Sequence, residues 1–433
     1  MIGKSRAAWG STRRYVGDNM RYRQRIRIFV FSLAILFMGL GTEFLAARPV
    51  PPGSQKAGVE VVSNPKTPVP SPGQRKKLVI QEELSIGENE GDEKYMFGAD
   101  VFFNTDDDGN FYVTDWDKRA ILKYDPSGMY VRTIGRKGQG PGEFQNLSVA
   151  RFDHTGALYV TDLGSHRISF FDKDGNFLRQ IPIPDVFEDL YIGAKGGYVS
   201  SRTIRADNEG GMAFRIVDGL FNDKFELATE FNVRFSSYKA PSGRDATAMA
   251  KFTAGILSDM AFRPYPMHLL AADGTIYFGY PEDYAIDVYS PDGNKIKTIR
   301  RAYDPIKIND RDKEYFAVTT AKPFVTRTGA GRRSEDEIRD ILKFIEYPDH
   351  KPAYRSFAVM ENGWLVVLVD FAGGDTSLFD IFDGRGGYIG QFKADLPAEY
   401  GRFFFKNGKA YAVEADEEGY KSVKRYGFKI EDY

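Results

Sequence analysis

The chain contains an internal repeat with a period of 47 residues, and this repeat constrains the fold more than any other feature. Residues 108–134 align without a gap with residues 155–181, and ten of the 27 aligned positions are identical. Both copies contain the run Tyr-Val-Thr-Asp, at 112–115 and at 159–162. A fixed period of this size is typical of folds in which each repeat buries its apolar surface against its neighbours.

Each copy consists of short runs in which apolar and polar residues alternate, rich in Tyr, Phe, Val and Ile and separated by Gly-containing turns. This pattern indicates antiparallel β-strands joined by tight turns. The second copy divides into four predicted strands, at 148–153, 157–162, 167–171 and 176–181. Four weaker copies follow, centred on 196–199, 273–277, 362–365 and 407–411. The sequence therefore predicts an all-β fold, a six-bladed β-propeller of four-stranded antiparallel blades.

The last copy ends after its third predicted strand, at 428–433, so its blade lacks one strand. The segment Lys77–Ile86 has the composition of a strand and precedes the first copy without a repeat of its own. We expect this N-terminal strand to complete the last blade. Such a closure would join the two ends of the ring and leave no open edge between the first and last blades.

Two motifs resemble those of a known family. The run Gly-Gln-Gly-Pro-Gly-Glu-Phe at 138–144 is similar to the inter-blade signature of the NHL-repeat six-bladed propellers, which belong to the TolB-like propeller superfamily. The run Asp162–Ile168 resembles the pattern Asp-x-Gly-Asn-His-Arg-Ile of the same family, with Ser165 in place of Asn. The similarity covers residues 98–184 and implies the fold more firmly than an activity.

The N-terminus has the features of an export signal. Residues 1–27 contain eight Lys or Arg and one Asp, an apolar run follows at 28–40, and small residues end the segment at 46–47. We expect residues 1–47 to be a signal peptide or a signal anchor, with Met20 as an alternative start. Residues 48–76 contain seven prolines and should form an extended linker, so the folded body spans 77–433. The protein is predicted to be extracytoplasmic, either periplasmic or secreted, and to contact a membrane only through this segment.

Composition excludes several classes of function. Subtracting the charge of +7 on residues 1–27 from the total of −1 leaves −8 for the body, which argues against nucleic acid as a partner. The chain has no cysteine, and its four histidines do not have the spacing of metal ligands. Residues 104–109 superficially match a calcium loop, but they lie between two predicted strands, where Asp-Gly is typical of a hairpin turn. We therefore expect no cofactor, with calcium as the alternative, and a monomer.

Two long insertions, at 232–266 and 301–355, each follow a predicted fourth strand. The loops after second and fourth strands share one face of a propeller, so both insertions should lie on that face. The second insertion contains a capping box from Ser334 to Glu337, followed by an apolar stripe that predicts a helix up to Pro348. We expect this helix to lie on the propeller.

Long loops on a rigid scaffold are common places for binding sites, so we expect a ligand on the same face. Arginine and aromatic side chains there would suit an anionic ligand, a carbohydrate or a peptide. The predicted binding residues are Trp116, Arg119, His166, Arg202, Arg263, Tyr280, Tyr284 and Phe371. The alternative for each of them is an ordinary packing or solvated residue, and Asp115 and Asp162 are expected to hold loop backbone. No residue is assigned a catalytic or metal-binding role.

These observations predict an exported propeller that acts as a non-catalytic binding module for a small molecule, a glycan or a protein partner. The alternative is an extracytoplasmic metal-dependent hydrolase or lyase with its site in the central channel. This alternative stays open because residues that converge on a propeller axis are far apart in sequence.

Overall fold

The structure is a computed structural model. It describes residues 58–68, 76–87, 91–98, 101–208, 211–238, 241, 245–328, 333–371, 377–394, 396, 403–415 and 420–432. Residues 1–57, which include the predicted signal and the first part of the predicted linker, lie outside these ranges.

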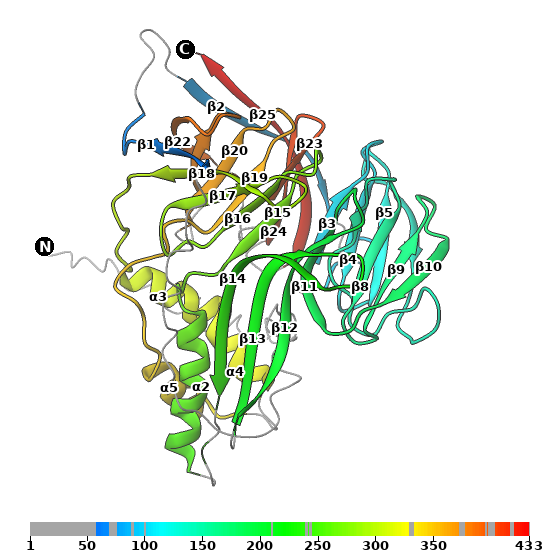
Figure 1. Ribbon diagram of the computed structural model, residues 1–433. Coiled ribbons are helices and arrows are strands. Elements are labelled where there is room, and N and C mark those ends of the chain that lie inside the picture. Colours follow the sequence, from blue (N-terminus) through cyan, green and yellow to red (C-terminus); the bar gives the residue numbers. More distant parts are fainter. Residues whose placement is uncertain are drawn as a thin grey trace, which may run out of the picture.

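Six antiparallel sheets form the six blades of a propeller, as the sequence predicts (Figure 1). Blade 1 contains β3 (Val101–Thr105), β4 (Phe111–Asp115), β5 (Ala120–Tyr124) and β6 (Tyr130–Ile134). Blade 2 contains β7 (Arg151–Phe152), β8 (Leu158–Asp162), β9 (Arg167–Phe171) and β10 (Phe177–Pro182). Blade 3 contains β11 (Val186–Ile192), β12 (Tyr198–Asn208), β13 (Gly211–Phe221) and β14 (Leu227–Tyr238). Blade 4 contains β15 (Met267–Leu270), β16 (Ile276–Gly279), β17 (Ala285–Tyr289) and β18 (Lys295–Arg301). Blade 5 contains β19 (Ser356–Val359), β20 (Leu365–Phe371), β21 (Ser377–Phe382) and β22 (Tyr388–Ala394). Blade 6 contains β23 (Phe403–Lys406), β24 (Lys409–Ala415) and β25 (Lys421–Asp432).

The repeated sequence forms the most buried strands of the first two blades. Every residue of β4 and β8 is buried, whereas the fourth strands β6 and β10 are largely exposed, so they form the outer edges. The turn before β10 requires glycine at position 175 for two reasons. Gly175 has a φ of 81°, and a Cβ atom there would lie 2.4 Å from the side chain of Ile134 in the preceding blade.

An apolar cluster fills each of the six seams between neighbouring blades. For example, Phe111 and Val113 of blade 1 pack against Tyr411 and Val413 of blade 6, and this cluster joins the first blade to the last. The seam between blades 3 and 4 differs, because its cluster of buried apolar residues is small and contains Val199, Ile276, Phe278 and Tyr289. Burial of these seams supplies the main stabilisation of the ring.

The ring closes through the N-terminal strand, as predicted. Strand β2 (Lys76–Ile86) pairs in antiparallel register with β25 and becomes the fourth strand of blade 6. In Figure 1 the blue β2 and the red β25 run side by side. The side chain of Ile86 is buried in the seam between blades 6 and 1, so the closing strand also contributes to the core.

The segment predicted to be a linker contains a strand that the sequence analysis did not identify. Strand β1 (Glu60–Asn64) pairs in parallel with β18 and forms a fifth strand on blade 4. The side chain of Asn64 donates hydrogen bonds to the carbonyls of Arg300 in blade 4 and Gly386 in blade 5. The chain therefore binds the outside of the propeller before it reaches blade 6.

Both insertions contribute to one helical cluster on one face of the propeller (Figure 1). Its elements are α2 (Ala246–Met260), α3 (Asp310–Phe316), the π-helical turn η3 (Ala317–Ala321), α4 (Lys322–Thr328) and α5 (Glu335–Lys343). Leu257 of α2 packs with Phe324 of α4 and Ile341 of α5. The capping box of Ser334 and Glu337 begins α5 as predicted. The first insertion starts later than predicted, because β14 continues to Tyr238.

None of the helices in the described ranges is both long enough and apolar enough to cross a bilayer.

Candidate functional site

Three of the predicted binding residues lie in turns of blades 1 and 2. Trp116 and Arg119 follow β4, and His166 follows β8 at the corresponding position. The ring of Trp116 packs 5.3 Å from that of Phe102, while His166 is exposed. Arg119 and His166 share a positive φ, 51° and 49°, because the two turns have the same backbone geometry.

Tyr284 and Arg202 make structural contacts with neighbouring residues. For Tyr284 this corrects the prediction that it lies on the surface. Tyr284 is only 4% exposed, and its hydroxyl donates a hydrogen bond of 2.6 Å to the buried carboxylate of Asp380 in blade 5. It is a core residue rather than a surface one, because its loop turns inward against the neighbouring blade. Arg202 is half-buried, and its Nε donates to Asp185 at 2.8 Å, which joins β12 to the start of β11.

The remaining predictions concern Arg263, Tyr280 and Phe371. Arg263 is exposed beyond the end of α2, and Tyr280 is half-buried after β16. The backbone of Phe371 ends β20, but its side chain lies outside the described part of the chain. Among the described side chains, no hydrogen bond, ion pair or ring contact joins two of the eight predicted residues.

The NHL-like motif holds the loop that links two blades. The guanidinium of Arg167 donates to the carbonyls of Gln139, Gly140 and Glu143 at 3.0, 2.8 and 2.8 Å. The carboxylate of Asp162 accepts hydrogen bonds from the backbone N–H groups of Gln145 and Asn146 at 2.9 and 2.8 Å. These contacts confirm the structural role expected for Asp162.

The calcium-like segment forms a hairpin turn. Asp106 accepts hydrogen bonds from the backbone N–H of Asn110 at 2.9 Å and from the hydroxyl of Tyr112 at 3.1 Å. Across the described ranges, no three His, Asp or Glu residues are grouped so that they could hold a metal ion.

A polar network links three innermost strands, each from a different blade. Arg151 of β7 forms an ion pair with Asp189 of β11, and its guanidinium lies 4.1 Å from the ring centroid of Tyr191. The Nε2 atom of His268 of β15 lies 2.8 Å from the backbone carbonyl of Asp189. Asp189 has a φ of 51° and sits where the register of β11 shifts. The contacts that Arg151 and His268 make here are typical of a network that fixes the inner strands.

A second polar group, which we call the seam cluster, lies between blades 3 and 4. It consists of Glu188, Asp218, Arg234, Tyr265 and Tyr280. In the register of blade 3, Glu188 of β11 lies opposite Ser201 of β12, and Ser201 lies opposite Asp218 of β13. Residues opposite one another in a sheet point to the same side, so these three share one side of blade 3. Tyr265 comes from the end of the first insertion and Tyr280 from blade 4. The cluster thus lies where the apolar packing of this seam ends.

Asp218 is the centre of the seam cluster. Its carboxylate is fully buried and accepts hydrogen bonds from the hydroxyl of Ser201 and from Nδ2 of Asn232 at 3.1 Å. Nε of Arg234 lies 3.5 Å from the same carboxylate. Burial lowers the pKa of the Arg234 guanidinium, but Asp218 and Tyr265 together outweigh this effect, so the pKa is raised.

Arg234 also has unused hydrogen-bonding capacity. Its Nε atom is paired with Asp218 at 3.5 Å, whereas its Nη2 atom is buried and has no hydrogen-bond partner among the described residues. The guanidinium carbon lies 4.9 Å from the ring centroid of Tyr265. Tyr265 keeps 51% of its surface exposed, yet burial of its hydroxyl raises its pKa.

The seam cluster combines opposite charges at short range. Burial raises the pKa of Glu188, and the positive charge of Arg234 partly offsets this effect. Burial likewise raises the pKa of Tyr280. The cluster brings the carboxyl group of Glu188, the guanidinium of Arg234 and the half-exposed side chain of Tyr265 around the buried carboxylate of Asp218.

The sequence analysis identified Tyr280 but not Glu188, Asp218 or Arg234 as candidate site residues. The available signal was the presence of charged residues inside otherwise apolar strands, since Asp218 interrupts Arg215–Phe221 and Arg234 lies within Phe231–Phe235. A buried charge needs a partner, so each of these positions indicates a polar contact.

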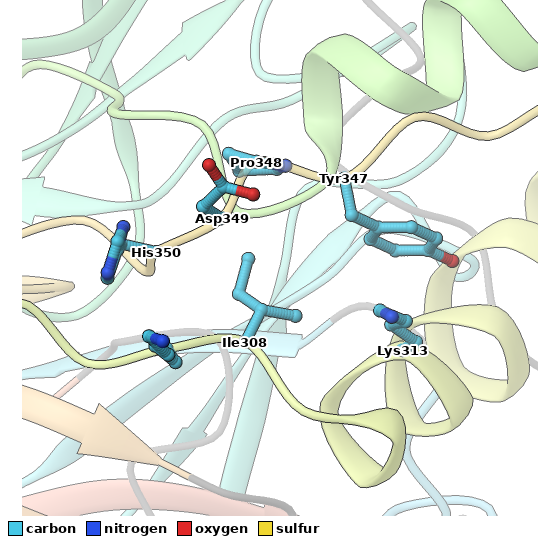
Figure 2. A pocket seen from close by; sticks show the side chains of 7 residues that line it. Ile308, Lys313, Tyr347, Pro348, Asp349 and His350 are labelled. Atoms are coloured by element: carbon cyan, nitrogen blue, oxygen red, sulfur yellow. The ribbon is translucent and has the colours of Figure 1, made fainter.

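A separate pocket of about 570 Å³ lies in the second insertion (Figure 2). Its lining consists of Lys307, Ile308, Lys313, Tyr347, Pro348, Asp349 and His350. Figure 2 shows Ile308 between His350 on one side and Tyr347 and Lys313 on the other.

Comparisons with known proteins agree with the fold. Residues 105–242 match the model of the DUF5128 family, described as a 6-bladed beta-propeller. No curated protein sequence matches the chain.

Similar solved structures include a candidate exported protein from Bacteroides fragilis, with 11% identity, a TM-score of 0.46 and coverage of 86% of this chain and 99% of the other. A DUF4221 family member from Bacteroides vulgatus has 12% identity, a TM-score of 0.45 and coverage of 83% and 100%. An inactive virginiamycin B lyase from Staphylococcus aureus, with quinupristin, has 12% identity, a TM-score of 0.37 and coverage of 81% and 99%.

The six blades, the closure by β2 and the family match over residues 105–242 lead to the same conclusion. The chain is a six-bladed β-propeller.

Proposed function

We propose that this protein is an extracytoplasmic binding protein and that its ligand occupies the seam cluster, on the face that carries the insertions. The observation that supports this most strongly is the half-exposed side chain of Tyr265 beside Arg234, whose buried Nη2 atom has no hydrogen-bond partner among the described residues. A buried donor without a partner costs about 1 to 3 kcal/mol. A ligand that accepts a hydrogen bond from Nη2 would recover that energy.

The chemistry of the cluster favours a ligand with many hydroxyl groups. A sugar hydroxyl both donates and accepts, so it can pair with the carboxylate of Glu188 and with the guanidinium of Arg234 at once. The exposed ring of Tyr265 offers an apolar surface for the C–H face of a sugar ring. We therefore propose a glycan as the ligand, in preference to a protein partner or an apolar small molecule.

A thermal-shift screen tests this proposal. The probes are neutral oligosaccharides (chitotetraose, xylotetraose and maltotetraose) and, as the competing class, a set of unstructured peptides. At least one oligosaccharide should raise the Tm of the wild-type protein and of Lys224→Ala, which changes an exposed residue of the turn between β13 and β14 and is not a member of the cluster. The shift should disappear in Tyr265→Ala. Stabilisation by peptides alone, or an equal shift in Tyr265→Ala, would contradict the proposal.

The extracytoplasmic location is supported by the basic segment 1–27 and the apolar run 28–40. A fusion of residues 1–57 to alkaline phosphatase, which becomes active only outside the cytoplasm, tests it. We expect activity from this fusion and none when two arginines are inserted within the run 28–40. An inactive wild-type fusion would contradict export.

A further inference from the structure

We propose that the pocket in the second insertion is a separate binding site for a small organic anion. We call it the insertion pocket, with the seven lining residues given above. Its volume of about 570 Å³ is within the range of small-molecule sites. The proposal does not depend on the seam cluster, because the two sites share no residue.

The walls of the insertion pocket are held in place by backbone pairing. The N–H of Ile308 donates to the carbonyl of Asp349 at 3.1 Å, and the N–H of Lys351 donates to the carbonyl of Ile306 at 2.8 Å. These bonds join the segment before α3 to the segment after α5. The two sides of the pocket therefore stay in register without a ligand.

A buried ion network anchors the same region to the propeller. Nζ of Lys351 lies 2.7 Å from the carboxylate of Asp312 in α3 and 2.8 Å from that of Asp370 in β20. Asp312 also accepts a hydrogen bond from the backbone N–H of Asn309, at 3.0 Å, in the capping box of α3. The two carboxylates share the ammonium group of Lys351 between them.

The lining of the insertion pocket is basic, although the body of the protein is acidic. With His350 neutral, two lysines and one aspartate give the lining a net charge of +1. Among the described side chains, none forms an ion pair with Lys307. Lys313 lies 3.3 Å from Asp310 in a solvent-exposed pair, and such pairs are weak enough for a ligand to replace.

The apolar part of the lining sets the second requirement for the ligand. Ile308 lies at the centre of the pocket, and Pro348 and Tyr347 line it on further sides (Figure 2). The ring of Tyr347 is supported from behind by Phe316, at 5.9 Å between centroids. An anion carried on a ring or short carbon skeleton would use both the lysines and this surface, whereas a bare inorganic ion would use only the lysines.

Isothermal titration of the full chain with three matched probes tests the proposal. The probes are glucuronate, glucose 6-phosphate and uncharged glucose, at concentrations up to about 10 mM. We expect saturable binding of at least one of the two anions and none of glucose. Comparison of the two anions distinguishes a carboxylate from a phosphate ester as the recognised group.

Variants connect the binding to the pocket. The double variant Lys307→Ala/Lys313→Ala should weaken anion binding about tenfold or more, since it removes two charged donors. Asp349→Asn should strengthen it, because it removes the one negative charge of the lining. Lys224→Ala, an exposed lysine outside the pocket, should bind as the wild type does. The absence of saturable binding, equal binding of glucose, or an unchanged Kd in the double variant would each overturn the proposal.

Discussion

The side chain of Asn64 accepts a hydrogen bond from the backbone N–H of Tyr388 at 2.8 Å, which joins the N-terminal strand β1 to blade 5. The same side chain donates to the carbonyls of Arg300 and Gly386, at 3.0 and 2.9 Å, so it joins blades 4 and 5 as well. Strand β1 is thus a strap across the outside of the ring. Residues 60–64, which follow the predicted export signal in sequence, are fixed to the propeller at this point.

The substitution Asn64→Ala removes all three of these hydrogen bonds. We expect the free energy of unfolding to fall by about 1 to 2 kcal/mol, because two part-buried hydrogen bonds and one exposed one are lost. The neighbouring change Ser63→Ala, at an exposed position on the same strand, should cost less than about 0.5 kcal/mol. Urea denaturation measures both. Equal effects would show that the side chain of Asn64 does not hold the strap.

Closure of the ring by β2 predicts a stepwise loss of stability on N-terminal truncation. A chain that begins at residue 58 keeps both strands, one that begins at 76 lacks β1, and one that begins at 88 lacks β2 as well. Loss of β2 exposes the seam on each side of blade 6, where Ile86, Leu78 and Ile80 pack. We expect this second step to cost about 5 kcal/mol or more, as burial of two or three aliphatic side chains is lost. An unchanged Tm after the second truncation would show that the ring does not depend on β2.

Arg167 is predicted to be a structural residue of the NHL-like motif. Arg167→Ala leaves three loop carbonyls without their donor, and we expect a loss of about 3 kcal/mol in the free energy of unfolding. Cleavage by a protease within residues 138–144 should become faster in the variant. Arg132→Ala, at an exposed position of β6, is the control and should cost less than about 1 kcal/mol. If the two variants are equally stable, the linking loop is held by other contacts.

The raised pKa of Glu188 predicts a dependence of stability on pH. When folding raises the pKa of a carboxyl group, the group does not destabilise the folded state at a pH below its pKa in the unfolded chain, because it is protonated in both states. As the pH rises from about 4.5 through the raised pKa, the folded state loses stability. Glu188→Gln removes this cost. The gain in the free energy of unfolding of the variant over the wild type should therefore be larger at pH 7.5 than at pH 4. A difference that is constant between the two pH values would contradict the burial of this carboxylate as the cause.

The repeat was sufficient to predict the fold because each copy contains its own local pattern. The run Tyr-Val-Thr-Asp forms the buried second strand in both blades, and the turn glycines follow at the same spacing. The missing strand of the last copy identified β2 as the closing strand. By contrast, β1 lies among prolines and pairs with a strand that begins 235 residues later, so only its short β-branched run could have indicated it.

The seam cluster could not be predicted, because it depends on strand register and on contacts between blades. Glu188 and Asp218 are brought to one side of blade 3 by pairing in which the register shifts next to each of them. Tyr284 and Tyr280 lie four residues apart in one loop, yet the first is buried against Asp380 and the second is half exposed. Nothing in the local sequence distinguishes these two tyrosines.

The central claim is that a ligand binds between blades 3 and 4, at Arg234 and Tyr265. A crystal structure of the protein with the oligosaccharide that gives the largest thermal shift tests this most directly. We expect density for the sugar against the ring of Tyr265 and within hydrogen-bond distance of Nη2 of Arg234. Sugar density on the opposite face of the propeller, with Arg234 untouched, would contradict the claim.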